Sequence, residues 1–368
     1  MTYKTAFSIL PYLKKEVSIK NIMTDPKYSK AVIDLLKVAH KLRKEGRFIE
    51  AEAKYLEVLE LDSDNVNALA GLGNLKCKTQ RFKEALRYYQ HALEIEDTNP
   101  YALAGIGDAY RGLKDLDSAL EAWLKYLSYH AADYKIITRV GDALRKKNDL
   151  PGSKKYYLMA IKLHPKDRFA LMGMGNVCEK LGNDAEALFH FEKLISCTDY
   201  SIVAMTSAAN IYRKKGAYEK AIELYDAALS KDSKNSHAWN GKADCLRGLQ
   251  KYEAAIQAWD NALKYGMNRI SALTRIGDSY LHMNDLENAE ISYEKTVTIG
   301  YDKYAYWGMF RIHLKRNHIS KAFETLTMLM KNEPHDARIS SEYNVFLEKY
   351  PQVKRIENSK AVPKLYSC

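Results

Sequence analysis

A small residue returns at every 34th position along most of this chain, and this period constrains its fold more than any other feature. A period of this length indicates a tandem array of one supersecondary unit, in which each unit packs on its neighbours. It argues against a globule with one central active site. The series consists of Ala51, Ala85, Ala119, Ser153, Ala187, Ala221, Ala255 and Ala289, with Ala322 following after a slip of one residue.

Two further columns keep the same period. Large residues stand four positions after the small ones and so share their helical face: Tyr55, Tyr89, Trp123, Tyr157, Phe191, Tyr225, Trp259, Tyr293 and finally Leu326. Small residues stand twelve positions before: Ala39, Gly73, Gly107, Gly141, Gly175, Ala209, Ala243 and Gly277. Phe310 interrupts this last column. The pattern predicts two close-packed helices per unit, with the large ring packing against the next unit.

These columns resemble the tetratricopeptide repeat (TPR), whose signature over 34 residues is W-x2-L-G-x2-Y, then A-x3-F, then P. With Ala51 as position 20, nine units run over 32–65, 66–99, 100–133, 134–167, 168–201, 202–235, 236–269, 270–302 and 303–336. The copy at 202–235 is the most complete, with Tyr212, Gly216, Tyr218, Ala221, Tyr225 and Ala228 in place. The resemblance implies an all-α, right-handed superhelical solenoid of antiparallel helix pairs.

The remaining sequence divides into flanks around the repeats. Residues 1–31 form an N-terminal flank with a short helix expected near 5–18. Residues 337–350 read as one amphipathic helix that caps the last exposed apolar face, as such stacks require. Residues 351–368 form a basic tail. We therefore expect one continuous array over 32–336 and no internal linker.

The net charge of +11 favours no nucleic-acid partner, because more than half of it lies in residues 1–31 and 351–368. A nucleic-acid footprint is usually a dense basic stripe. Solvated ends are the preferred interpretation, and weak contact of these ends with acidic membrane or nucleic acid stays open.

Motifs for chemistry are not found in the sequence. Five cysteines show no CxxC pair and favour a reducing, cytoplasmic setting. The N-terminus lacks a secretory pattern, and no apolar run has membrane-spanning length. Gly71-Leu72-Gly73 and two similar pairs fall in the middle of predicted helices, so packing is favoured over phosphate binding. We expect no enzyme, no catalytic residues, no cofactor and no metal site.

The predicted site is instead the groove formed by the first helices of the units. Position 9 carries Asn or Asp in seven successive units, and positions 12 and 13 carry Lys or Arg. Asp residues there favour pairing within their own helix. Asn side chains can bond an extended peptide, and neighbouring cations can hold a carboxylate. The groove candidates are Asn74, Asn176, Asn210, Lys78, Arg111, Arg145 and Arg213.

Two additional sites are candidates. Some members of the family grip a C-terminal carboxylate with five residues over three units, and the best window here keeps only Asn74, Lys135 and Arg139. Lys135 and Arg139 lie one helical turn apart and could still hold an acidic group. Tyr304 and Trp307 could form an exposed aromatic patch in the last unit. The competing interpretation is that the helix at 337–350 covers them.

Taken together, these features predict a scaffold or adaptor that binds other proteins, as extended, helical or acidic segments, in the concave groove. An RNA-binding helical-repeat protein is the first alternative, and Asp108, Asp142, Asp244 and Asp278 argue against it by interrupting the basic column. A non-catalytic helper subunit of a larger enzyme complex is the second. Self-association stays open.

Overall fold

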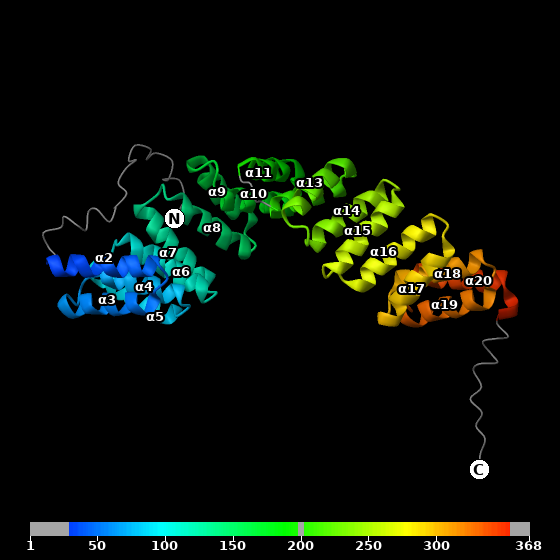
Figure 1. Ribbon diagram of the computed structural model, residues 1–368, viewed down its shortest axis with the longest axis horizontal. Helices are drawn as coiled ribbons and strands as arrows, with labels where there is room; N and C mark the ends of the chain where they lie inside the picture. Colours follow the sequence, from blue (N-terminus) through cyan, green and yellow to red (C-terminus); the bar gives the residue numbers. More distant parts are fainter. Residues whose placement is uncertain (1–28, 198–201, 354–368) are drawn as a thin grey trace, which may run out of the picture. The chain divides into compact units, whose positions relative to one another are not determined.

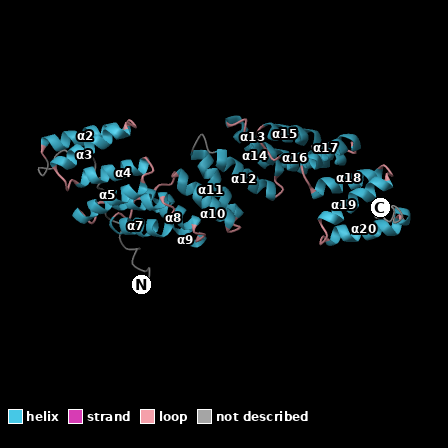
Figure 2. Cartoon of the chain, turned by 90° about the horizontal axis from the view of Figure 1, so that it is seen from below, coloured by secondary structure: helices cyan, strands magenta, loops and turns pink. Residues whose placement is uncertain are grey.

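The computed structural model describes residues 29–197 and 202–353, and there the chain consists of helices joined by short turns, without strands (Figure 2). The helix expected near 5–18 and most of the basic tail lie outside these residues. The α-helices are α2 (Lys30–Lys44), α3 (Phe48–Leu61), α4 (Val66–Lys78), α5 (Phe82–Ile95), α6 (Pro100–Gly112), α7 (Leu116–Tyr129), α8 (Tyr134–Lys146), α9 (Leu150–Leu163), α10 (Arg168–Lys180), α11 (Asp184–Cys197), α12 (Ile202–Lys214), α13 (Tyr218–Lys231), α14 (Ser236–Gly248), α15 (Tyr252–Lys264), α16 (Arg269–His282), α17 (Leu286–Ile299), α18 (Lys303–Lys315), α19 (Ile319–Asn332) and α20 (Ala337–Lys349).

The helices form antiparallel pairs in tandem, from α2 with α3 to α18 with α19 (Figure 1). The all-α fold class and the paired architecture predicted from the sequence are confirmed. The chain divides into two compact units, Met1–His190 and Phe191–Cys368. Within each unit, the second helix of one pair also packs on the first helix of the next pair, as α5 packs on α6 and α13 packs on α14.

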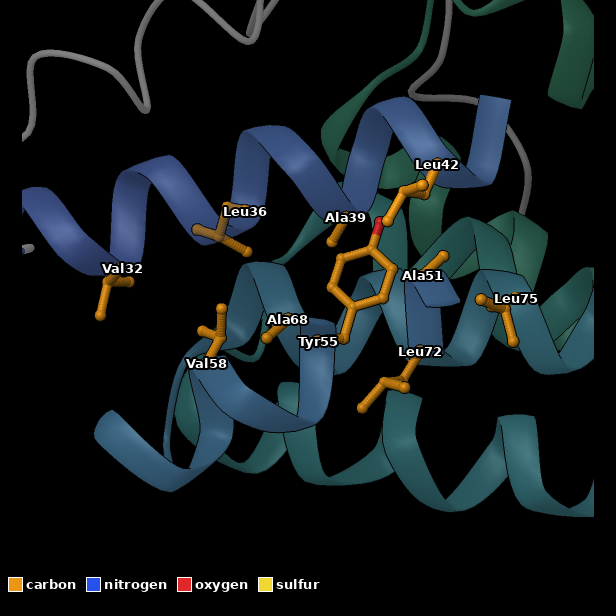
Figure 3. Packing of buried hydrophobic residues seen from close by; sticks show 10 residues of the cluster. All are labelled: Val32, Leu36, Ala39, Leu42, Ala51, Tyr55, Val58, Ala68, Leu72 and Leu75. Carbon is orange, nitrogen blue, oxygen red and sulfur yellow. The ribbon is translucent and has the colours of Figure 1, made fainter. Parts of the chain in front are cut away.

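The repeating columns form the core of both units. Each Ala of the position-20 column is fully buried, as are the rings four residues later, from Tyr55 to Tyr293. Figure 3 shows the Tyr55 ring of α3 pointing toward Ala39 and Leu42 of α2. Small residues on both helices leave the space that this ring fills, so the pairs approach closely.

Glycine at positions 6 and 8 is explained by the same rings. A Cβ atom on Gly71 would overlap the ring of Tyr55 from the preceding repeat, and one on Gly73 would overlap Tyr89 of its own repeat. The tyrosine ring occupies the volume that a side chain would take. The packing interpretation of these glycine pairs is therefore confirmed.

Position 15, in the turn between the two helices of each repeat, adopts a left-handed backbone in all nine described pairs. Glycine occupies it at Gly46, Gly182 and Gly216, and asparagine at Asn148, Asn284 and Asn317. Gln80, Lys114 and Gln250 hold the same conformation with φ between 60° and 65°. Residues with a Cβ atom are disfavoured there, so these three turns are strained.

Polar residues in the turns between repeats begin the next helix. Asn65 is fully buried and its side chain accepts a hydrogen bond from the backbone N of Ala68 at 3.0 Å. Asn235 does the same for Ala238 at 3.0 Å. Such caps satisfy amide groups that have no partner inside the helix. They fix where α4 and α14 start, and thereby which residues of these first helices face outward.

Candidate functional site

In each unit, the first helices of neighbouring repeats are joined by polar bonds: α2 with α4 and α6 with α8 in Met1–His190, and α14 with both α12 and α16 in Phe191–Cys368. Residues 31 apart in sequence meet across adjacent first helices. Arg43 Nη1 donates to Asn74 Oδ1 at 3.0 Å, and Arg139 Nη1 donates to Asp108 Oδ2 at 2.7 Å. Within each unit, we call the surface formed by that unit's own first helices the first-helix face. Its side chains are positioned by one another before any ligand arrives.

In the unit Met1–His190, the structure gathers two of the predicted residues around Asp108. Arg111 Nη2 lies 3.1 Å from Asp108 Oδ1, and Arg139 bonds the other carboxylate oxygen. Burial nevertheless raises the pKa of Asp108, with Arg139, Arg111 and Lys78 opposing the shift. Arg111 also lies over the ring of Trp123, 5.6 Å from its centroid. Arg139 and Arg111 are thus held by one partly desolvated carboxylate.

The other predicted residues of this unit are more separate. Arg145 Nη2 lies 2.5 Å from Asp142 Oδ1 in its own helix. The Lys135 ammonium lies 5.9 Å from the Tyr134 ring centroid and is exposed, as is Lys78 at the end of α4. Asn176 is half-buried on α10, and Asn74 is exposed beside Arg43. Lys135 and Arg139 therefore share a turn of α8, but only Arg139 is tied to a neighbouring repeat.

In the unit Phe191–Cys368, Asp244 of α14 is the centre of a denser cluster. Arg275 Nη1 lies 2.9 Å from its Oδ1, and Arg213 Nη1 lies 3.3 Å from its Oδ2. Arg247 Nη2 is 3.9 Å from Oδ1. The pairing within α14 predicted for Asp244 is thus its longest contact, and the shorter ones link three repeats.

These four residues line a hollow of about 440 Å³ together with Tyr218, Gly248, Tyr252 and His282. A second hollow of about 370 Å³ shares Arg213 with the first. The second is lined by Asn210, Asn235, Asn240, Thr206 and His237, with Ile202 and Val203 at one side. The two hollows together form a polar surface over α12, α14 and α16, which we call the arginine hollow.

Two asparagines of the arginine hollow accept hydrogen bonds from core rings. Tyr225 Oη donates to Asn210 Oδ1 at 2.6 Å. Asn240 Oδ1 accepts from Trp259 Nε1 at 3.2 Å and from Arg275 Nη1 at 2.9 Å. Burial raises the pKa of Tyr225 to about 12, so its hydroxyl stays protonated and donates at neutral pH. The predicted residues Asn210 and Arg213 are brought together here.

The prediction missed Arg275 and Asn240. It placed Arg247 in the basic column of the groove and favoured pairing of Asp244 with Arg247 within one helix. A signal for Arg275 is present in the sequence. Position 6 is glycine after a repeat whose large ring is tyrosine, and arginine after a repeat whose ring is tryptophan, as in Trp123 with Arg139 and Trp259 with Arg275. A tyrosine ring fills the space that a Cβ atom at position 6 needs.

The two aromatic residues predicted to form a patch in the last repeat have different surroundings. Tyr304 is 67% exposed, whereas Trp307 packs into a cluster with Phe310 and α20. The guanidinium of Arg338 in α20 lies 5.2 Å from the Trp307 ring centroid. The competing interpretation, in which the helix at 337–350 covers the patch, holds for Trp307 and does not hold for Tyr304.

Burial sets the protonation state of three described cysteines. Burial raises the pKa of Cys77 and Cys178 to about 11 and that of Cys245 to about 12, so these thiols are protonated at neutral pH. Thiolates, not thiols, are nucleophiles.

Within 29–197 and 202–353, no cluster of three or more His, Cys, Asp or Glu is arranged to hold a metal ion. None of the helices described there has the length and apolar character needed to cross a membrane.

Comparison with known proteins identifies the repeat class. Models of the tetratricopeptide repeat match residues 36–100, 206–265 and 270–299. The chain therefore contains tetratricopeptide repeats in both of its units. A search of curated proteins gave no significant match.

Several solved structures resemble this chain. The C-terminal part of a TPR protein from Cytophaga hutchinsonii is 18% identical, with a TM-score of 0.58, covering 65% of this chain and 99% of that one. PilF of Pseudomonas aeruginosa is 13% identical, with a TM-score of 0.53, covering 58% and 98%. YrrB, described as a TPR protein with an unusual peptide-binding site, is 22% identical, with a TM-score of 0.45, covering 51% and 97%. The first two likenesses support the fold.

Proposed function

We propose that this protein is a non-enzymatic scaffold that binds segments of partner proteins on its first-helix face. The observation that carries the proposal is the network of asparagine, aspartate and arginine side chains on that face, because bonds between repeats hold these groups in place. Groups positioned in advance lose little conformational entropy when a ligand binds. The tetratricopeptide repeats support a role in protein interaction.

The charges of this face favour protein over RNA as the partner. Asp108 and Asp244 lie inside the basic clusters of the two units, so a polyanion bound along the first helices of either unit would meet a carboxylate there. The described cysteines are free, which agrees with a reducing compartment such as the cytoplasm.

Paired variants test the face. In one, Lys135→Gln and Arg139→Gln remove two cations from α8. In the control, Lys83→Gln and Lys125→Gln remove two exposed cations from the second helices α5 and α7. We expect the α8 variant to lose partners in quantitative affinity capture from the source cell, with circular dichroism unchanged. Equal loss from both variants, or from neither, would contradict binding by the first-helix face in this unit.

A further inference from the structure

The geometry points to the arginine hollow as a receptor for an acidic peptide segment, whose carboxylates contact Arg213, Arg247 and Arg275. This inference rests on the proposed function and specifies its ligand. Three guanidinium groups surround one carboxylate, that of Asp244, whose side chain is 10% exposed. The three arginine side chains are 32%, 40% and 35% exposed. The hollow therefore has an excess of positive charge that solvent and ligands can reach.

The hydrogen bonds within the hollow also indicate that its ligand is an acceptor. The acceptor atoms of the hollow already accept hydrogen bonds from the protein. Asn210 Oδ1 accepts one from Tyr225, and Asn240 Oδ1 accepts from Trp259 and Arg275. Each carboxylate oxygen of Asp244 accepts a hydrogen bond from an arginine. Trp and Arg side chains only donate, so the oxygen of Asn240 must face them. Its NH₂ group then faces elsewhere.

The groups of the hollow that are left to bind a ligand are hydrogen-bond donors. Arg275 uses a single nitrogen, Nη1, for its bonds to Asn240 and Asp244, and no partner is described for the NH₂ groups of Asn210 and Asn240 among residues 202–353. A ligand that matches this surface must supply acceptors. An extended peptide supplies backbone carbonyls for the amides, and acidic side chains supply carboxylates for the arginines, which bind carboxylates in bidentate geometry.

An apolar contact at the edge favours a peptide over a free anion. Val203 lines the second hollow and is 62% exposed, next to Ile202. An aliphatic side chain near the acidic residue could cover this valine and bury apolar area. A free carboxylate or phosphate would contact the arginines alone.

The experiment measures fluorescence anisotropy of a short fluorescein-labelled peptide of alternating Glu and Val, titrated with the full chain. Peptides that alternate Gln with Val and Lys with Val, and single-stranded oligouridylate, are the comparison probes. We expect the Glu peptide to bind roughly tenfold or more tightly than the Gln peptide, because charge-assisted bonds are lost in the latter. Equal binding of the Glu and Gln peptides overturns the proposal, as does tighter binding of oligouridylate at the same salt concentration.

Variants locate the site. Arg275→Gln and Arg247→Gln should each weaken binding of the Glu peptide by roughly tenfold. Arg269→Gln is the matched control, because Arg269 is an exposed arginine at the start of the same helix, α16, outside the hollow. Asp244→Asn should tighten binding, because it removes the internal carboxylate that competes for the three arginines. Circular dichroism and thermal melting confirm folding of each variant.

Two outcomes would contradict the arginine hollow as the binding site even if the peptide binds to the protein. Arg275→Gln could leave the affinity equal to that of Arg269→Gln, which would place the peptide elsewhere. Asp244→Asn could weaken binding, which would show that the ligand does not compete with this carboxylate. Failure here is separable from failure of the scaffold proposal, since the α8 variant tests a different unit with physiological partners.

Discussion

One cluster occurs twice in this molecule, four repeats apart, and the two copies differ in instructive ways. Both contain an Asp at position 9, an Arg at position 12 and an Arg at position 6 of the next repeat: Asp108, Arg111 and Arg139 in the first unit, and Asp244, Arg247 and Arg275 in the second. Both accompany a buried tryptophan at position 24. The second copy adds Arg213, where the first has Cys77, and Asn240, where the first has Ala104.

The third arginine changes how tightly the others are held. In the first cluster, Arg111 lies 3.1 Å from the carboxylate, and only Arg139 is closer. In the second, Arg213 and Arg275 take the two carboxylate oxygens, and Arg247 stays at 3.9 Å. In the cluster that has arginine rather than cysteine at position 12 of the preceding repeat, the arginine at position 12 of the same repeat as the carboxylate thus lies farther from it. The two arginines of the first cluster link neighbouring repeats through one carboxylate. The second cluster has three arginines around one carboxylate, and we infer that its additional positive charge serves a ligand.

The largest expected effect tests why arginine can stand at position 6 at all. Gly241→Ala places a Cβ atom against the ring of Tyr225 and should lower the free energy of unfolding by about 1–3 kcal/mol, the usual cost of overpacking. Ser207→Ala is the control, because position 6 there follows Phe191 and already carries a Cβ atom. Urea denaturation measures both. A neutral Gly241→Ala would mean that tyrosine does not exclude side chains from position 6.

An effect of similar size is expected at position 5 of the two tryptophan repeats, where one has Asn240 and the other Ala104. Asn240→Ala removes the acceptor of the buried Trp259 Nε1 and should cost about 1–3 kcal/mol. Trp123 Nε1 is buried without a hydrogen-bond partner among the described residues. Ala104→Asn should supply one and stabilise the first unit by about 0.5–1.5 kcal/mol.

Thermal denaturation of these two single variants gives changes of opposite sign if the clusters are otherwise equivalent. Destabilisation by both would show that the surroundings of Trp123 have no room for a carboxamide. The occurrence of arginine at position 6 after a tryptophan repeat would then not depend on which residue stands at position 5.

The comparison also shows what the sequence could predict. The period of 34 and its Ala and ring columns were sufficient for the helix pairs, because each column fills one recurring space, as Tyr55 does between Ala39 and Gly71. The repeat register followed from the same spacing. These features are local, or lie one repeat away, so the pattern of a single unit contains them.

The arginine hollow could not be predicted in the same way. Asp244 has a partner three residues away in sequence, and pairing rules within a helix favour Arg247. The shorter bonds, to Arg213 and Arg275, depend on the distance between first helices of neighbouring repeats, which sequence spacing does not give. For Trp307 the sequence left two interpretations open, and only the position of α20 decides between them.

Turn residues supply a smaller effect that should be equal in the two clusters. Lys114 and Gln250 follow Arg111 and Arg247 by three residues and hold a left-handed backbone with φ of 65° and 60°. Replacing either with glycine should stabilise the protein by about 1 kcal/mol, the balance of relieved strain and greater freedom when unfolded. Asn148→Gly is the control and should gain less, because asparagine tolerates this conformation. Guanidinium denaturation checks all three variants, and unequal gains at Lys114 and Gln250 would show that the clusters constrain their turns differently.

The smallest effect is the pH dependence of the first cluster. Burial raises the pKa of Asp108 above its unfolded value of about 3.9, so the folded state binds more protons than the unfolded state between these two values. The contribution of Asp108 to stability is therefore present below about pH 3.9 and is lost as pH rises through the raised pKa. The difference in unfolding free energy between the wild type and Asp108→Asn, measured across this range, should fall as pH rises.

Cys77→Arg sharpens the same test by giving the first cluster the third cation of the second. An added guanidinium favours the ionised carboxylate and lowers its pKa, so the fall with pH should shrink when Asp108→Asn is compared in the Cys77→Arg background. If the difference instead rises with pH in the natural background, Arg111 and Arg139 outweigh the burial of Asp108. The first cluster would then already be electrostatically satisfied with two arginines, and the extra cation of the second cluster would be even less necessary for holding Asp244 in place.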